Sequence, residues 1–334
     1  MATMATDLTT THLLCDGSRI KKQKLDDDHE VNNIHQKLKN LSDFKVDKIL
    51  HNNTSRKTVC VQGSFKELDG PAIVLLEKTA FQEEHVTNES GLFSEKGVLA
   101  KTFDNDIYGN YDFFPAIELN SIKTTVIHPA TEKHIEKYSR QNLYLIEETP
   151  DIYNKIVLPH ITAEQFDVQW VFNILEHKAE TDRIICEDTD PEIGFVLVPD
   201  LKWNGSVETL YLLALIKKRG IKSLRDLKQE HLPLLRNIKQ KCTEAIKSKY
   251  GLDTTQLRIY LHYQPSFYHL HIHFTYLRHE APGITTERAH LLANIISNIE
   301  LLPDYYQKVT IPFVVRESDK LYEKLKDSAT SQEN

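Results

Sequence analysis

Three histidines alternate with apolar residues in one short segment. Residues 269–274 read His-Leu-His-Ile-His-Phe. Successive side chains of a β-strand point to opposite faces, so the pattern predicts a strand with His269, His271 and His273 on one face and apolar side chains on the other. We expect the apolar face to pack and the histidine face to look outward, where each imidazole titrates near its ordinary pKa of about 6.5.

Three interpretations of this row compete. It could be a chance polar face. It could bind a metal ion, but at about 3.3 Å per residue the outer histidines start about 13 Å apart, too far to share one tetrahedral ion, so only two of them plus a distant ligand would serve. It could contact a polyphosphate, since one imidazole can attack phosphorus while its neighbours contact adjoining groups. We favour the polyphosphate.

A second strand precedes the row. Leu257, Ile259 and Leu261 alternate with polar residues and His262 follows, after which Pro265 introduces a turn. This pattern predicts a β-hairpin. If the turn is centred at residues 265–266, His262 lies opposite His269, close enough to share one ligand.

The elements around the hairpin predict an α+β domain with one antiparallel sheet. Apolar residues at spacing four, Phe166, Trp170 and Ile174, indicate a helix. The full set that we expect is a helix over about 163–179, strands over 183–186 and 195–198, a helix capped by Ser206 and ending at Arg219, and a helix over about 232–250.

The first half of the chain is organised differently. Residues 1–40 are polar and lack apolar periodicity, which predicts a disordered tail, within which the basic segment 19–24 is a possible nuclear import signal. Residues 41–145 carry short apolar runs and predict a smaller, mostly β domain, closed by a helix that starts near Thr131. Residues 146–160, with two prolines, predict a hinge before a catalytic domain over 161–334.

Composition excludes several classes of function. The 334 residues carry a net charge of −7, which disfavours binding to long duplex nucleic acid but not to a small anion. The four cysteines are scattered, as in a reduced intracellular protein. The longest apolar run, 211–216, is too short to cross a membrane.

The row resembles the histidine triad motif of the nucleotide hydrolases and transferases of the HIT superfamily. A wider set of segments, 200–203, 223–227, 231–236, 260–263, 280–283 and 287–292, is similar to its scavenger decapping branch. The resemblance covers roughly residues 100–310. It implies hydrolysis of the 7-methylguanosine triphosphate cap on cap dinucleotide or short capped RNA fragments, with no metal ion or cofactor, in cytoplasm and nucleus.

The resemblance also implies roles for single residues. His271 would be the nucleophile, and His269, His273 and His262 would flank the phosphates. Two further phosphate contacts would come from Lys202 and Ser266. Taken alone, Lys202 reads as a surface lysine and Ser266 as a turn residue.

Base recognition would follow from the positive charge of methylated guanine. Trp170 would supply a cation–π contact, and Glu180 and Asp200 would accept hydrogen bonds from the base edge. By itself Trp170 fits core burial, and the two acids fit a helix end and a turn. Phe267 and Tyr268, in the loop before the row, would also bind substrate. The family often has tyrosine where this chain has Phe267, which has no phenol hydroxyl to donate.

The N-terminal domain would act as a lid exchanged between the two chains of a homodimer. Its candidate substrate contacts are Asn105, Tyr108, Lys133 and Lys137. Two alternatives remain open: a hydrolase of dinucleoside polyphosphates or nucleoside phosphoramidates, and a cap-binding adaptor without turnover.

Overall fold

The computed structural model describes residues 38–164, 167–201 and 203–329, which form two compact units divided between Gln141 and Asn142. The expected tail up to residue 37, with its basic segment, lies outside the described residues, as do Phe166 and Lys202. The division falls four residues before the expected end of the first domain at 145.

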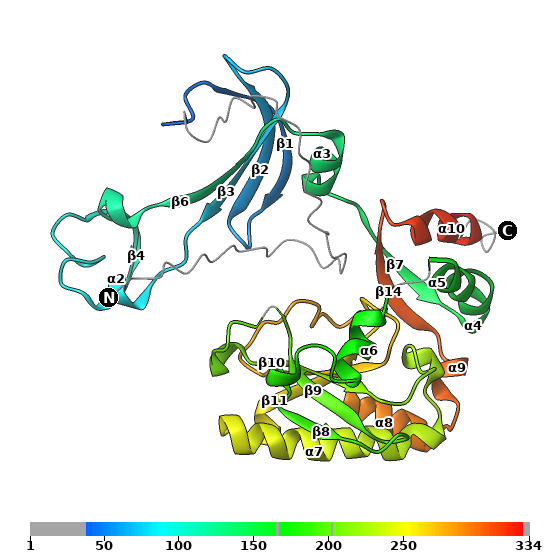
Figure 1. Ribbon diagram of the computed structural model, residues 1–334. Helices are drawn as coiled ribbons and strands as arrows, with labels where there is room; N and C mark the ends of the chain where they lie inside the picture. Colours follow the sequence, from blue (N-terminus) through cyan, green and yellow to red (C-terminus); the bar gives the residue numbers. More distant parts are fainter. Residues whose placement is uncertain (1–37, 165–166, 202, 330–334) are drawn as a thin grey trace. The chain divides into compact units, whose positions relative to one another are not determined.

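The N-terminal unit is built on an antiparallel four-stranded sheet in the order β1-β2-β3-β6 (Figure 1). Its strands are β1 (Phe44–Asn53), β2 (Thr58–Phe65), β3 (Ala72–Lys78) and β6 (Ile122–Ile127). The apolar runs in residues 59–61, 72–76 and 124–127 form parts of these strands, as predicted. Helix α3 (Glu132–Tyr138) starts beside Thr131, also as predicted, and packs through Ile135 onto the sheet.

A separate hairpin projects from this sheet. It consists of β4 (Val98–Asn105) and β5 (Tyr108–Phe114), with the short helix α2 (Glu83–Thr87) before it and the 3-10 turn η1 (Ile117–Leu119) after it. Every residue of both strands is exposed. Within residues 38–141 the hairpin therefore has no apolar cover.

The C-terminal unit contains one antiparallel six-stranded sheet, which confirms the α+β class. The order is β13-β11-β12-β10-β9-β8. The bounds are β8 (Cys186–Asp188), β9 (Phe195–Pro199), β10 (Tyr211–Ile216), β11 (Leu257–His262), β12 (His271–Tyr276) and β13 (Ala289–Leu291).

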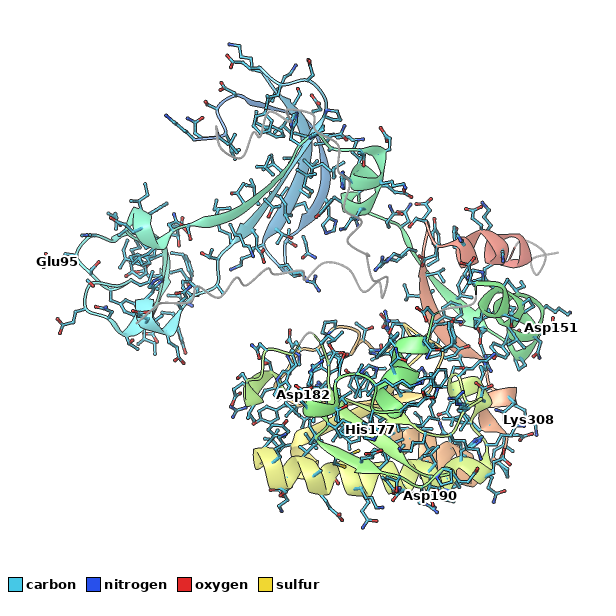
Figure 2. All side chains as sticks on the ribbon, viewed as in Figure 1. Glu95, Asp151, His177, Asp182, Asp190 and Lys308 are labelled. Atoms are coloured by element: carbon cyan, nitrogen blue, oxygen red, sulfur yellow. The ribbon has the colours of Figure 1, made fainter. Side chains whose placement is uncertain are left out.

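Helices cover both faces of this sheet (Figure 1). On one face α7 (Leu232–Tyr250) and α8 (Leu292–Leu301) pack against alternate strand residues such as Leu212 and Phe274. On the other face α6 (Gln169–Leu175) packs against Leu213 and Leu215. Charged side chains such as Asp190 and Lys308 lie at the edge of the C-terminal unit (Figure 2).

Two expected helices are wrong in different ways. Residues 211–216 form a strand, not part of a helix from Ser206 to Arg219, and all six are buried. A strand covered on both faces loses the alternation that identifies strands, so its apolar run resembled a helix segment. The helix expected over 163–179 ends as α5 (Leu158–Glu164) and restarts as α6, where the Asp167 carboxylate accepts from the Gln169 backbone N–H at 2.9 Å.

The expected helix over 232–250 is confirmed as α7. Pro233 lies in its first turn, and Gly251 ends it with a φ of 72°. No helix in the described part of the chain is both long and apolar enough to cross a membrane.

The segment expected as a hinge is folded into the C-terminal unit. Strand β7 (Leu143–Glu148) pairs with β14 (Ile311–Arg316) in a two-stranded sheet. Then follow α4 (Pro150–Ile152), the π-helical turn η2 (Tyr153–Val157) and α5, with α10 (Lys320–Ala329) against η2. Helix α9 (Tyr305–Lys308) lies against α8. Residues 146–160 therefore have regular structure here: Pro150 occupies the first turn of α4, where proline is tolerated, and Pro159 follows the π-helical turn.

Candidate active site

The histidine row lies on a buried face, not on the outward face that we expected. His271 and His273 belong to β12, between β10 and β11, and His269 precedes the strand. The three are only 3%, 3% and 4% exposed, since α6 and the loop of residues 263–268 cover this face. Burial disfavours the charged form of an imidazole, so their pKa values lie below 6.5 instead of near it.

The register of the hairpin also differs from the prediction. Tyr260 pairs with His273, which puts His262 level with His271 and not with His269. A shift of two residues keeps His262 on the same face. The His262 and His273 rings lie 4.2 Å apart between centroids, so these two imidazoles make the close cross-strand pair.

His271 is held with one nitrogen bonded and the other open. Its Nδ1 lies 2.7 Å from the backbone carbonyl of His269, and because a carbonyl only accepts, Nδ1 carries the proton. In the neutral ring the Nε2 lone pair is then unprotonated. Nε2 is buried and makes no hydrogen bond within the described residues, and burial lowers the pKa of His271 to about 4. At neutral pH the ring has the form of a nucleophile.

The other imidazoles differ in what they bond. His269 directs Nε2 to the Ile216 carbonyl at 2.8 Å, so it fixes the backbone that in turn holds His271. His273 stacks on Tyr260 and lies with Nδ1 3.2 Å from the Tyr211 hydroxyl. With that hydroxyl as donor, the neutral ring of His273 carries its proton on Nε2 and can donate it to an anion.

Arg288 is a charged residue near the row that the sequence patterns did not single out. Burial, followed by the charge of the Arg288 guanidinium, lowers the pKa of His262 to about 2. The same charge contributes to the lowered pKa values of His271 and His273. The Arg288 Nε is buried and has no hydrogen-bond partner in the part of the chain that the structure describes. Only its place in the 287–292 segment could have indicated it.

Two aromatic residues link the row to the expected base site. The Phe267 ring stacks on the His271 imidazole, with centroids 3.9 Å apart and 14° between planes. The Phe267 ring also meets the half-buried Trp170 of α6 edge-on, with ring centroids 4.8 Å apart. Phe267 thus connects the candidate nucleophile with the candidate base-stacking residue.

The two candidate acids, Glu180 and Asp200, are half-buried, and one arginine connects the segments that carry them. Glu180 has a φ of 55° and its Oε2 accepts from Arg183 at 2.6 Å. The same guanidinium donates to the Pro199 carbonyl at 3.2 Å, next to Asp200 at the end of β9. Arg183 therefore fixes Glu180 against the strand end that carries Asp200.

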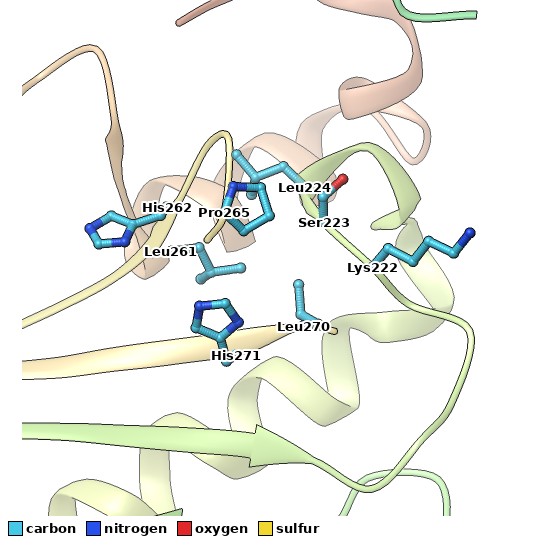
Figure 3. A pocket seen from close by; sticks show the side chains of 8 residues that line it. All are labelled: Lys222, Ser223, Leu224, Leu261, His262, Pro265, Leu270 and His271. Carbon is cyan, nitrogen blue, oxygen red and sulfur yellow. The ribbon is translucent and has the colours of Figure 1, made fainter. Parts of the chain in front are cut away.

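The remaining candidates of this unit lie in or near the covering loop. Ser266 is exposed, and the Tyr268 hydroxyl donates to the Gln264 side-chain carbonyl. A small pocket lies beside His262 and His271, and Pro265 also lines it (Figure 3).

The four lid candidates all belong to the N-terminal unit. Asn105 pairs with Tyr108 across the turn of the exposed hairpin. Lys133 and Lys137 lie one helical turn apart on α3, both exposed. None lies in the unit that holds the histidines. No group of three or more histidine, cysteine, aspartate or glutamate side chains is placed to hold a metal ion among the described residues.

An antiparallel α+β domain with this buried row has the features of the histidine triad class that its sequence resembles. Comparison with models of known families identifies the family within this class. A model described as "Scavenger mRNA decapping enzyme (DcpS) N-terminal" matches residues 39–141, and one described as "Scavenger mRNA decapping enzyme C-term binding" matches residues 169–289. The chain belongs to the scavenger mRNA decapping enzyme family, as the sequence segments indicated.

Relatives from distant organisms span nearly the same length. The m7GpppX diphosphatase of Homo sapiens is 49% identical over 296 residues, 87% of this chain and 87% of that protein. The protein of that name from Ascaris suum is 44% identical over 85% of this chain and 94% of its own length. The one from Schizosaccharomyces pombe is 37% identical over 86% and 96%.

Proposed function

We propose that this chain is an m7GpppX diphosphatase. It hydrolyses the triphosphate bridge of the 7-methylguanosine cap in cap dinucleotide or short capped RNA fragments, as a step in mRNA decay. The name of relatives up to 50% identical over most of the chain supports the substrate. The observation that carries the chemistry is the neutral His271, whose buried Nε2 has no partner within the described residues and lies near Arg288.

The reaction proceeds in two steps. The Nε2 lone pair of His271 attacks the phosphorus nearest the methylated guanosine, and the bond from that phosphorus to the bridging oxygen breaks. A nucleoside diphosphate, or a shortened oligonucleotide with a 5′ diphosphate, leaves. Water then hydrolyses the phosphohistidine, which releases 7-methylguanosine monophosphate and restores the imidazole.

Charge on the phosphate is stabilised by groups around the row. Arg288 supplies a fixed positive charge, and His273 and His262 supply ring N–H donors. The His269 carbonyl accepts from Nδ1 of His271 and so stabilises the positive charge that develops on the attacking ring. We assign Ser266 and Lys202 to further phosphate contacts, and Phe267 and Tyr268 to further substrate contacts.

Recognition of the methylated base falls to Trp170, Glu180 and Asp200. The indole stacks on the cationic base, and the carboxylates accept hydrogen bonds from its edge. The Arg183 pair holds Glu180 in position for this role.

The N-terminal domain completes the site. We propose a homodimer in which residues 41–145 of each chain act as an exchanged lid and Asn105, Tyr108, Lys133 and Lys137 contact substrate. The exposed apolar strands of the β4–β5 hairpin support an interface. We place the protein in cytoplasm and nucleus, where capped fragments arise.

One experiment tests substrate, bond and metal requirement together. The protein is incubated with methylated and unmethylated cap dinucleotides in excess chelator, and products are identified. We expect 7-methylguanosine monophosphate and a nucleoside diphosphate from the methylated substrate, and none from the His271→Asn variant. Release of 7-methylguanosine diphosphate, or activity only after metal is added, would overturn the proposal.

A further inference from the structure

A fully buried ion pair lies outside the histidine row. The side chains of Arg225 and Glu148 are 1% and 0% exposed and lie 2.6 Å apart. Arg225 is saturated: Nε donates to the Glu148 carboxylate at 2.8 Å, one terminal nitrogen to the Glu148 backbone carbonyl at 2.7 Å, and the other to the Tyr306 and Val309 carbonyls at 2.9 and 2.7 Å. The guanidinium thus links the Glu148 carboxylate to the backbone carbonyls of residues 148, 306 and 309.

The same carboxylate holds the start of the loop that covers the row. Its Oε1 accepts from the Tyr263 hydroxyl at 2.5 Å, and its Oε2 accepts from the Gln264 amide at 3.2 Å. The side-chain oxygen of Gln264 accepts from the Tyr268 hydroxyl at the far end of the loop. Both ends of the segment 263–268 are therefore anchored through Glu148.

Between these anchors lies Phe267, whose ring covers one face of the His271 imidazole. That imidazole already has Nδ1 bonded to the His269 carbonyl, so rotation of the ring away from the stack would break this bond. The stack and this hydrogen bond together hold the ring, and a displaced loop would remove the stack. The direction of the Nε2 lone pair is then held by the hydrogen bond alone.

Burial of such a pair is costly, and apolar replacements of similar shape are often as stable. Burial raises the pKa of the Glu148 carboxyl, an effect that the hydrogen bond from Tyr263 and the charge of Arg225 oppose. Stability alone therefore gives little reason for four polar side chains to converge here. Fixed geometry is the gain that hydrogen bonds at both oxygens provide.

We propose that Glu148 is a positioning residue for the reaction: through Tyr263 and Gln264 it fixes the 263–268 loop, so that Phe267 holds His271 in its attacking orientation. The inference rests on the proposed function, because it concerns the same nucleophile. Glu148 is the last residue of β7, the first strand of the C-terminal unit after the division at residue 141. The chain therefore enters this unit through the strand that carries the anchor of the loop.

Variants at the loop end of the network test the proposal without leaving Arg225 unpaired. Gln264→Ala and Tyr263→Phe should each lower kcat about ten- to a hundredfold, because small misplacement of a reacting group costs that much. Gln307→Ala is the matched control: its amide bonds the Arg225 and Leu227 carbonyls and does not touch the loop. It should lower thermal stability and leave kcat unchanged.

A second readout does not depend on activity. The chain has two tryptophans, so in a Trp203→Phe background Trp170 alone reports on its neighbour Phe267. Acrylamide quenching of Trp170 should rise in the two loop variants and not in Gln307→Ala. Unchanged kcat and quenching in the loop variants, or equal changes in the control, would overturn the proposal. If the parent cleaves no cap but quenching still responds, the proposed function fails and the loop anchoring stands.

Discussion

His271 has its protonation state fixed by the backbone. The His269 carbonyl holds the proton on Nδ1, so Nε2 is the only ring nitrogen that can form a bond to phosphorus. A residue that merely contacted phosphate would, when changed, slow turnover in part. A nucleophile forms the bond that defines the pathway, so its loss removes the covalent route.

We therefore expect His271→Asn to keep the fold, to bind a cap analogue and to show no measurable hydrolysis. Rapid quenching of the parent at neutral or alkaline pH should trap 7-methylguanosine monophosphate on a peptide containing residue 271. His177→Asn, which changes a half-exposed histidine outside the row, is the control and should keep full activity. A tenth of the parent rate in His271→Asn would contradict the assignment.

Gly283 is required where its backbone passes His262. Its φ is 82°, and an added Cβ would lie 2.8 Å from the His262 Nε2. Gly283→Ala therefore adds left-handed strain of about 1–3 kcal/mol and pushes the imidazole away from His273. We expect kcat to fall at least tenfold. Gly220→Ala, at a φ of 90° with open space around it, isolates the strain and should leave kcat near the parent value.

We propose that selectivity for the methylated base depends on Trp170. A desolvated cation–π contact is worth about 2 kcal/mol, or roughly thirtyfold in affinity, and exists only for the methylated base. Trp170→Ala should lose about that factor in the ratio of kcat/KM between methylated and unmethylated cap dinucleotides. Trp203→Phe should keep the ratio. Equal discrimination by Trp170→Ala and the parent would exclude the stacking role.

Among the helices and strands, those with a regular apolar periodicity could be predicted from the sequence. The alternation in 269–274 identified the strand, and the apolar stripe of α7, including Ile238 and Cys242, gave that helix correctly. Strand β10 was missed because both of its faces are buried. Tyr211, which lies on β10 beside His273, could not be recognised for the same reason.

The register and the burial of the row could not be predicted either. The loop between β11 and β12 is fixed by the Glu148 carboxylate, which lies 115 and 116 positions earlier in the chain than its partners. The cover over the imidazoles comes from α6 and Phe267, which are brought there by tertiary packing. Local pattern identified which residues share the face, and long-range contacts determined whether that face meets water.

Burial of the row has a measurable consequence for stability. The folded pKa of His271, about 4, lies below its unfolded value of 6.5, so between these values the unfolded chain binds more protons. Stability from this group is complete above pH 6.5 and falls as pH drops toward 4. The parent should lose about 2 kcal/mol more unfolding free energy between pH 7 and 5 than His271→Asn, measured by urea titration. Equal pH dependence would mean that the ring titrates near 6.5 when folded.

At the scale of the whole molecule, two units of different character share the chain. The C-terminal unit is closed by helices on both faces of its sheet. The N-terminal unit leaves a two-stranded hairpin exposed along its whole length. Isolated two-stranded hairpins are at best marginally stable in water, so an uncovered one indicates a missing partner surface.

In the homodimer that we propose, a second copy of the chain is that partner. Large apolar side chains are exposed on both faces of the hairpin: Leu99, Phe103 and Phe114 are 62%, 60% and 57% exposed. We expect the purified protein to have a hydrodynamic mass near twice 38.7 kDa at micromolar concentration. Leu99→Asp should shift it toward the monomer and lower activity together, since the lid contacts are lost. Lys101→Asp, a charge change on the same strand, should keep the dimer. A fully active monomer would show that each chain closes its own site and that the exposed hairpin serves some other purpose.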